Sequence, residues 1–391
     1  MSDPRRSPTK ATLLGAGITV AYLLPVFLTG ALAPQIREEL SFSATGLGAS
    51  VSVYWGMAAV TSASFGRLVD RIGAVASMRL AAIIAAGCSL GIALTVHRWS
   101  VLVVWLALGG CALSIGQPAA NRMIAQVVPA ARLGIAFGVK QSAPPTATML
   151  AGASVPLLAA IWGWRPAFIS AAVLAATIGV SAGRRDLATR GARRREQERL
   201  RDPAVIAVLT AAFSVGAGTA LAVATFFVES VAVAGLGTNA AGTVLAAASI
   251  ASIGVRVVAG GISDRVPRGH LRGCAALMLL GSAGIGLLAT DRPGLMSVGV
   301  VLALAGTWGF PGVFWFALIR AYMDSPGRIT GVVGAGVLLG GTFGPTLFGL
   351  LVDATSFPVA WAVSAGVGVL GAAATLYGDG RLALSTRQAS R

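Results

Sequence analysis

The sequence predicts an all-α membrane protein with twelve transmembrane helices in two pseudo-symmetric bundles of six. The prediction rests on an apolar composition, on long apolar runs that recur regularly, and on a pattern that appears once in each half. Of the 391 residues, 55% are hydrophobic and 11% are charged. Apolar runs of about 18–25 residues match the hydrocarbon thickness that a helix must cross, whereas helices of a soluble core are shorter and keep a polar face.

Each long apolar run is expected to form one span. The chain contains 51 glycines, which suits helices that approach closely in lipid. The twelve expected spans lie at about 11–33, 46–66, 74–95, 100–121, 134–160, 165–183, 203–228, 239–260, 272–290, 295–319, 329–352 and 357–377.

The basic residues orient these spans. A formal net charge of +16 would suit a nucleic-acid-binding protein, but its distribution follows the spans. If the N-terminus is cytoplasmic, 24 of the 30 Lys and Arg residues lie inside, and only Arg37, Arg98, Arg165 and Arg292 lie outside. Cytoplasmic loops carry such an excess. We therefore expect a multi-pass protein of the inner (plasma) membrane with both termini cytoplasmic, whose partners are lipid and a small molecule and not nucleic acid.

The longest polar stretch separates the two halves of the chain. Residues 1–183 are expected to form the N-terminal six-helix bundle, and residues 203–391 the C-terminal one. Between them, residues 184–202 form a basic cytoplasmic linker. Such a stretch is expected to be solvated at the anionic inner leaflet, although a regulatory role stays open.

The halves also repeat each other. Asp70-Arg71 after the second span has a counterpart in Asp264-Arg265 after the eighth. Gly116-Gln117-Pro118 in the fourth span likewise corresponds to Gly309-Phe310-Pro311 in the tenth, at nearly the same offset. An internal duplication about an axis along the membrane normal is indicated. Halves related in this way enclose a cavity, which is the architecture of a transporter.

The string GRLVDRIG, residues 66–73, resembles the loop signature of the major facilitator superfamily, G-x-L-x-D-R-x-G followed by basic residues. Gly66, Leu68, Asp70, Arg71 and Gly73 fit that signature, but Ala74 and Val75 stand where basic residues are expected. The second copy keeps Gly260, Asp264 and Arg265 and has Pro267 in place of the last glycine. The resemblance covers essentially the whole chain and implies a bacterial-type transporter of twelve helices, without indicating its substrate.

In the superfamily this string acts as a gating latch at the cytoplasmic helix ends. The resemblance implies that role for Gly66, Asp70, Arg71 and Gly73, and for Asp264 and Arg265 in the second copy. Physically, an aspartate here can cap a helix N-terminus and pair with arginines of neighbouring helices. A loop that only sets topology would explain the arginines but not the repeated aspartate.

Two basic residues, Lys140 and Arg256, fall inside spans. A charge at mid-membrane costs about 2.5–3.5 kcal/mol, so neither is expected to face lipid. No carboxylate is expected at their depth, and an anionic ligand would supply the missing charge. The alternatives are that Lys140 extends to the inner surface and that Arg256 donates to carbonyls or to the latch aspartate.

The string GVRVVAGGISDR, residues 254–265, resembles the eighth span of superfamily members that carry organic anions such as monocarboxylates and oxalate. That resemblance implies a carboxylate-binding role for Arg256. Pro144-Pro145 is expected to kink the fifth span just above Lys140. Glu229 and Asp353, at outer span ends, are the candidates for coupling.

The remaining candidates are polar and aromatic residues of the spans, each of which can equally be a packing residue. The full set of expected substrate-binding side chains is Arg256, Lys140, Gln141, Gln117, Asn121, Tyr22, Tyr54 and Trp308.

These patterns favour a secondary active transporter that moves a small organic anion by alternating access, with a proton as a candidate coupling ion. Export of hydrophobic drugs or metabolites on the same fold is the alternative, and a non-transporting membrane sensor or scaffold is a remote one. An enzyme is not expected, because the spans hold no cluster of catalytic groups. No cofactor or metal site is expected, and the chain is expected to be monomeric.

Overall fold

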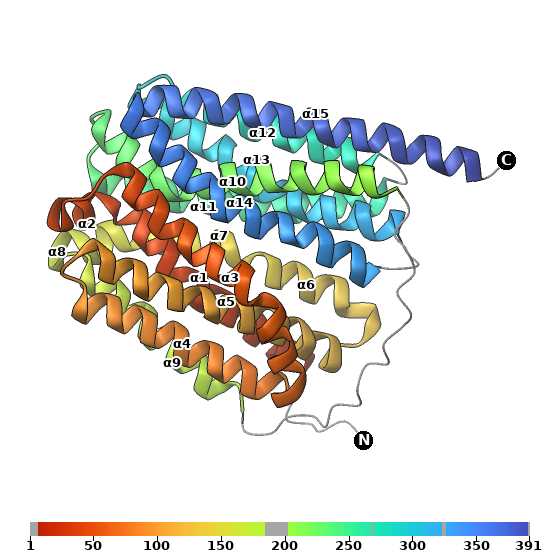
Figure 1. Ribbon diagram of the computed structural model, residues 1–391, viewed down its shortest axis with the longest axis horizontal. Coiled ribbons are helices and arrows are strands. Elements are labelled where there is room, and N and C mark those ends of the chain that lie inside the picture. The colour runs from red at the N-terminus through yellow and green to blue at the C-terminus, as the bar shows by residue number, and fades with distance from the viewer. Residues whose placement is uncertain (1–6, 184–201, 267–268, 323–325, 390–391) are drawn as a thin grey trace.

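The computed structural model describes residues 7–183, 202–266, 269–322 and 326–389, which form helices and short connections without a β-strand. The helices run along the long axis of the molecule (Figure 1). The start of α1 and the end of α15 lie at one end, here called the terminal end, while α2 and α8 lie at the opposite end, here called the closed end (Figure 1). Apart from Asp202, the expected linker lies outside the described residues.

The N-terminal bundle contains the elements up to α9. They are α1 (Pro8–Ala31), α2 (Ala33–Leu40), α3 (Ala44–Ile72), α4 (Ala74–Thr95), α5 (Trp99–Val127), η1 (Ala130–Arg132), α6 (Leu133–Gln141), α7 (Ala143–Ser154), η2 (Val155–Ala159), α8 (Ala160–Trp162) and α9 (Arg165–Ser181). The C-terminal bundle contains α10 (Pro203–Val233), α11 (Thr238–Arg265), α12 (His270–Leu288), α13 (Pro293–Ala321), α14 (Pro326–Ala354) and α15 (Phe357–Ala389).

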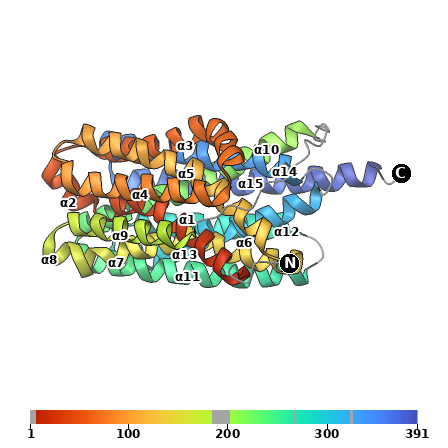
Figure 2. The ribbon, with the colours of Figure 1, turned by 90° about the horizontal axis from the view of Figure 1, so that it is seen from below.

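Each of the twelve expected spans coincides with a helix, and the fifth is broken into α6, α7, η2 and α8. Ten described helices are long and apolar enough to cross a membrane. The two expected spans not among these ten are α9, an apolar helix of 17 residues, and α3, whose end carries Arg67, Asp70 and Arg71. Figure 2 shows that α15 extends beyond the other helices at the terminal end.

Helix packing repeats between the bundles. In one bundle α5 packs against α3 and α4, and in the other α13 packs against α11 and α12. The peripheral pair α4 and α9 likewise has a counterpart in α12 and α15. Across the bundles, α3 packs on α14, α7 packs on α11, and α1 lies against α10. The duplication predicted from the sequence is therefore present in the pattern of helix contacts.

The sequence sets the helix ends locally. Ser7 caps α1 by accepting from the Lys10 N–H at 3.1 Å, and Pro8 follows at the first helical position, where its missing N–H costs nothing. Ser43 caps α3 in the same way through the Gly46 N–H. Gly73, with φ of +85°, separates α3 from α4, a conformation that favours glycine.

Glycines bring the two bundles together near the closed end. A Cβ on Gly48 of α3 would overlap the main-chain carbonyl of Pro345 in α14. Its counterpart in the second half, Gly242 of α11, would meet the Val155 side chain and the Gly152 carbonyl. In α1, a Cβ on Gly30 would lie 2.6 Å from the Thr225 Cα of α10. These contacts between bundles, here called the seam, need helices without side chains at the crossing points.

Candidate functional site

The fifth expected span is broken beside its charged residue. Helix α6 ends at Gln141, α7 begins at Ala143, and the Ser142 N–H turns back to the Val139 carbonyl at 3.1 Å. Pro144 and Pro145 cause the break, because neither has an N–H to donate to the preceding turn. The kink predicted from the sequence is confirmed.

Arg256 of α11 lies at this break. Its Nε donates to the Trp308 carbonyl of α13 at 2.8 Å, and its Nη1 donates to the Gln141 carbonyl of α6. The first partner belongs to its own bundle and the second to the other. Among the described residues the Arg256 guanidinium has no carboxylate partner, and its Nη2 has no hydrogen bond.

Lys140 precedes Gln141 and is 3% exposed. Within the described parts of the chain, its ammonium group has neither a hydrogen-bond acceptor nor a carboxylate partner. In this conformation the Lys140 residue as a whole is thus largely enclosed by protein. The broken helix thus carries Lys140 itself and receives Arg256 from α11 at the adjoining residue, Gln141.

Aromatic side chains pack between the bundles, and one of them belongs to Trp308, the partner of Arg256. Trp308 contacts Phe27 of α1 edge to face, with ring centroids 6.1 Å apart. Trp55 of α3 fills the space above Gly341 of α14, where a Cβ would collide with its ring. The indole N–H groups of Trp55 and Trp308 are both buried without an acceptor in the described structure. Trp308 thus places an unpaired indole N–H in the same residue whose carbonyl accepts from Arg256.

Other expected site residues lie elsewhere. Tyr22 and Tyr54 pack inside the N-terminal bundle, where the Tyr54 hydroxyl donates to the Tyr22 carbonyl at 2.7 Å. Gln117 is exposed on α5, and Asn121, one turn further on, has a buried side-chain oxygen without a donor. Hydrogen bonds thus connect Arg256 with the carbonyls of Gln141 and Trp308. In the described structure Tyr22, Tyr54, Gln117 and Asn121 have no hydrogen bond to these residues.

The two coupling candidates bridge the bundles at the closed end. Glu229 of α10 pairs with Arg37 of α2. Asp353 of α14 accepts from the main-chain N–H groups of Ala44 at 3.1 Å and Thr45 at 2.7 Å. Asp353 therefore caps α3 from the opposite bundle, where unpaired N–H groups and the helix dipole favour a negative charge. The sequence predicts only that Arg37 is one of the four outer basic residues, and it does not predict the pairing with Glu229.

A third ionic contact at the closed end stays within the N-terminal bundle. Arg165 of α9 donates to both carboxylate oxygens of Glu39, at 2.8 and 2.6 Å, and the Trp164 indole donates to the same carboxylate. The hydrogen bonds from Arg165 lower the pKa of Glu39 below its ordinary value, although partial burial acts in the opposite direction. Sequence spacing gives no signal for this contact, because its partners are more than a hundred residues apart.

The latch string is helical and not a loop. Helix α3 continues to Ile72, so Asp70 lies within its last turn, and Gly73 is the residue before α4. In the described structure Asp70 has no contact that caps a helix N-terminus, and the expected pairing with an arginine of a neighbouring helix is present. Asp70 instead accepts from Arg122 of α5 at 2.9 Å, in the same bundle, and Arg122 also donates to the Val69 carbonyl.

The remaining latch residues have fewer contacts. A Cβ on Gly66 would meet nothing within 4 Å, so this glycine is not needed for close packing here. Arg71 and Arg265 lie in the last turns of α3 and α11 and are exposed. Asp264 lies in α11, but its side chain is outside the described residues.

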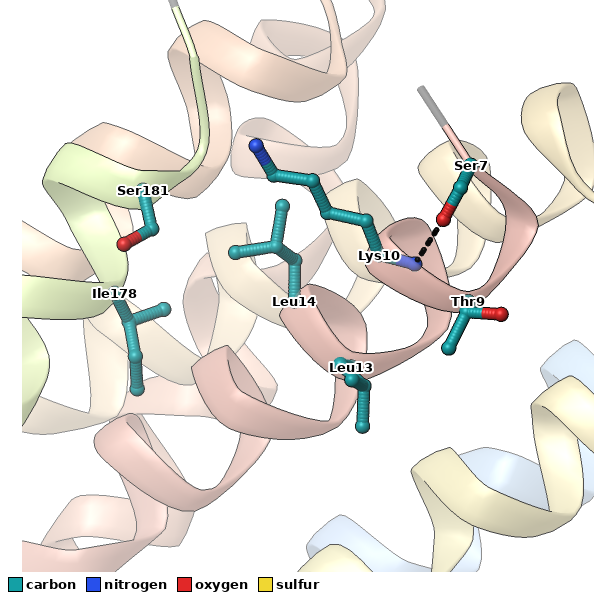
Figure 3. A pocket seen from close by; sticks show the side chains of 7 residues that line it. All are labelled: Ser7, Thr9, Lys10, Leu13, Leu14, Ile178 and Ser181. Carbon is teal, nitrogen blue, oxygen red and sulfur yellow. Dashed lines mark hydrogen bonds between the residues drawn. The ribbon is translucent and has the colours of Figure 1, made fainter. Parts of the chain in front are cut away.

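A groove of about 430 Å³ opens between α1 and α9 at the terminal end (Figure 3). None of the expected site residues lines it. Lys10 extends across it from α1 toward α9, above Leu14, while Ile178 and Ser181 come from α9 (Figure 3). One cation above apolar side chains is typical of helix ends at a membrane surface.

The fold is similar to that of solved transporters. A D-xylose–proton symporter matches with a TM-score of 0.76 and 17% identity, over 94% of this chain and 97% of that one. A bacterial homologue of the human lysosomal transporter Spinster, in inward-facing occupied and unoccupied structures, matches with TM-scores of 0.74 and 0.72. Each of these two has 14% identity and covers 99% of this chain and 98% of that one. At these identities the likeness concerns the fold alone.

Sequence comparison identifies the family. A search of curated proteins finds no match. A family model described as the Major Facilitator Superfamily matches residues 15–333, which is most of the chain. Together with the apolar helices and the repeated bundles, this match shows that the chain belongs to the Major Facilitator Superfamily of membrane transporters.

Proposed function

We propose that this transporter moves a small organic anion across the inner (plasma) membrane by alternating access, with residues 1–183 and 203–391 as its two moving bundles. A single observation carries the anion assignment: Lys140 and Arg256 bring two positive charges into the protein, and no described carboxylate pairs with either. Buried charge is stable only when it is paired. A carboxylate ligand would supply that pairing.

The proposed orientation puts the terminal end in the cytoplasm. Arg37, Arg98, Arg165 and Arg292 all belong to the closed end, at α2 or at the starts of α5, α9 and α13. Apart from Lys140 and Arg256, the other described Lys and Arg residues belong to the terminal end. Because positive charge is enriched on the cytoplasmic side, the closed end would face outward.

With that orientation, the structure corresponds to an inward-facing conformation. The seam and the contacts of Glu229 and Asp353 lie toward the closed end, whereas the bundles diverge toward the terminal end (Figure 1). Arg256 is about 21 Å further along α11 than the seam glycine Gly242, from the helical rise of 1.5 Å per residue. An anion that enters from the cytoplasm would meet Arg256 where the bundles begin to separate.

The decisive experiment measures ligand affinity and melting temperature together in purified protein. The panel contains acetate, oxalate, succinate and benzoate, with xylose and tetraphenylphosphonium as neutral and cationic comparisons. A ligand that binds the folded state raises its apparent stability. We expect an anion to bind, and Arg256→Lys to weaken its binding by about 1–3 kcal/mol, the scale of a hydrogen bond to a charged group. Lysine offers a point charge in place of a planar fork.

Variants separate a ligand-binding arginine from a structural one. Arg256→Gln should weaken anion binding more than Arg256→Lys, and Lys140→Gln should weaken it less. Arg272→Lys, an exposed arginine of the same bundle that pairs with Asp379 at 3.0 Å, is the matched control and should bind normally. Unchanged affinity for every anion in Arg256→Lys, with a lowered melting temperature, would refute the anion assignment.

Export of hydrophobic drugs or metabolites is the second candidate. It is favoured by the two carbonyls that already accept from Arg256 and by the aromatic rings of Phe27, Trp55 and Trp308 between the bundles. Under this hypothesis tetraphenylphosphonium or a similar apolar ligand binds, and Trp308→Ala reduces its affinity while Arg256→Lys does not.

A further inference from the structure

We infer that the Gln141 carbonyl is an exchangeable partner of Arg256. Pro145 leaves this carbonyl without a donor in its own helix, so it accepts from the Arg256 guanidinium of the other bundle until an anion displaces it. This inference deepens the proposed function and rests on it for the identity of the displacing ligand. The contact between the bundles stands independently of the ligand.

The free carbonyl follows from the sequence. In a continuous α-helix the carbonyl of residue 141 would accept from the N–H of residue 145, and in a tighter turn from that of residue 144. Both residues are proline and have no N–H. The next donor along the chain, the Thr146 N–H, bonds to the Ser142 carbonyl at 3.1 Å. The Gln141 carbonyl is therefore left without a main-chain donor within its own helix.

Arg256 satisfies that carbonyl from the opposite bundle. The Gln141 carbonyl is only partly accessible to water, and such a carbonyl is destabilising when it has no donor. The contact therefore stabilises this arrangement of α6 and α11. Between described residues, further hydrogen bonds that join the bundles include those of Arg37 with Glu229, of Asp353 with the start of α3, and of the Thr346 N–H with the Ser52 hydroxyl at 3.2 Å. Of these contacts, the one between Arg256 and Gln141 belongs to the region nearest the terminal end.

The geometry of the guanidinium makes this contact compete with a ligand. A carboxylate binds arginine most strongly through two parallel N–H groups on one edge. The edge that includes Nε is engaged by the Trp308 carbonyl, and the edge that joins Nη1 and Nη2 is engaged at Nη1 by the Gln141 carbonyl. An anion that binds the second edge displaces the Gln141 carbonyl. Binding then releases a contact between the bundles, which couples ligand occupancy to bundle movement.

Two neighbouring prolines allow a matched test. Pro145→Ala adds an N–H placed to donate to the Gln141 carbonyl within the helix, so this carbonyl no longer needs Arg256 as a donor and no longer competes with an anion for it. Pro144→Ala makes the same chemical change one residue earlier, but its N–H is placed for the Lys140 carbonyl in an α-helix. Both variants remove one proline from the same break, and only the first is expected to weaken the contact with Arg256.

The conformational measurement needs no ligand. In full-length protein with its three cysteines replaced by alanine, spin labels are placed at Ile135→Cys on α6 and Val266→Cys after α11, both exposed. The labels report the separation of the bundles at the terminal end. We expect Pro145→Ala to raise the fraction of molecules with a shorter distance between the two labels to at least three times that of the parent. Pro144→Ala should match the parent.

The binding measurement uses benzoate and succinate on the same variants. We expect Pro145→Ala to bind the anion at least threefold more tightly than the parent, because the competing carbonyl is satisfied, and Pro144→Ala to bind as the parent does. If Pro145→Ala shifts the distances but no anion binds the parent, the contact stands and the proposed substrate class fails. If both alanine variants match the parent in distance and affinity, the exchange is refuted, whatever Arg256→Lys does to anion binding.

Discussion

Arg37 and Glu229 form an ion pair that joins the two bundles at the closed end, with 22% and 12% of the side chains exposed. The second Glu229 oxygen is buried and has no hydrogen bond in the described structure. Because the pair is largely shielded from water, its loss should matter more than the loss of an exposed pair, which is worth about 0–1 kcal/mol.

The first prediction concerns this pair. Glu229→Gln removes the ionic contact and should let the closed end open more often. A cysteine at the buried seam position Ser52 reports opening, and its alkylation rate should rise about tenfold, equivalent to about 1.4 kcal/mol. Glu39→Gln is the control, because Glu39 pairs with Arg165 inside one bundle. Equal rates in both variants would mean that the Arg37–Glu229 pair does not hold the bundles together.

The second prediction tests the seam. Gly48→Ala places a methyl group against the Pro345 carbonyl, and overpacking of this kind costs about 1–3 kcal/mol. Transport should fall at least fivefold while expression is retained, since only the conformation closed at this end is affected. Gly87→Ala on α4, with open space at its Cβ position, is the control and should transport normally. A normal rate for Gly48→Ala in reconstituted vesicles would contradict the close approach.

The third prediction concerns the latch. Asp70→Asn should greatly reduce transport and leave the melting temperature almost unchanged, because the Asp70 side chain is 78% exposed in its pair with Arg122. Asp264→Asn, in the less complete second copy, should reduce transport less. Uptake and thermal unfolding are measured on the same preparations. If both variants transport normally, the string only sets topology.

The fourth prediction is a pH dependence. Hydrogen bonds from Arg165 lower the pKa of Glu39, so the carboxylate favours the folded state at neutral pH. That contribution is present above the unfolded pKa of about 4.3 and is lost as the pH falls through the lower folded value. Melting temperature should therefore drop below about pH 4 more steeply in the parent than in Glu39→Gln. Parallel curves would show that the contact does not contribute.

The fifth prediction tests orientation. In intact cells, an impermeant thiol reagent added outside should label Arg292→Cys at the closed end and leave Val266→Cys at the terminal end unlabelled until the cells are opened. Each variant serves as the control for the other. The reverse pattern would place the terminal end outside and overturn the proposed inward-facing assignment.

The sequence was sufficient to predict the helices and the duplication, since both depend on apolar length and on repeated motifs. It also predicted the break before α7, because Pro144 and Pro145 have a local effect on backbone hydrogen bonding. It did not predict that Asp70 pairs with Arg122 within one bundle, or that Asp353 caps α3. Such contacts depend on how helices that are distant in the sequence are placed in space. The sequence shows only which end of a span a charged side chain lies near, and several partners are plausible there.

Among the candidate site residues, too, the sequence singles out some and cannot assign others. Arg256 and Lys140 stood out because a charge within an apolar run is rare. Tyr22 and Tyr54 were indistinguishable from cavity-lining residues in the sequence, since an aromatic side chain with a hydroxyl suits either role. Only the packing of their rings inside the N-terminal bundle distinguishes the two.

The glycine seam has a consequence for the speed of the transport cycle. Burying a flexible side chain costs up to about 1.5–2 kcal/mol in rotamer entropy, whereas glycine has no rotamers to lose. At Gly48 and Gly30 the bundles meet backbone to backbone, so no side chain has to adopt a single rotamer for these crossing points to close. Opening likewise releases little side-chain freedom there. A surface of this kind should separate and close again with a small entropic barrier, which suits a protein that must repeat the movement for every molecule it carries.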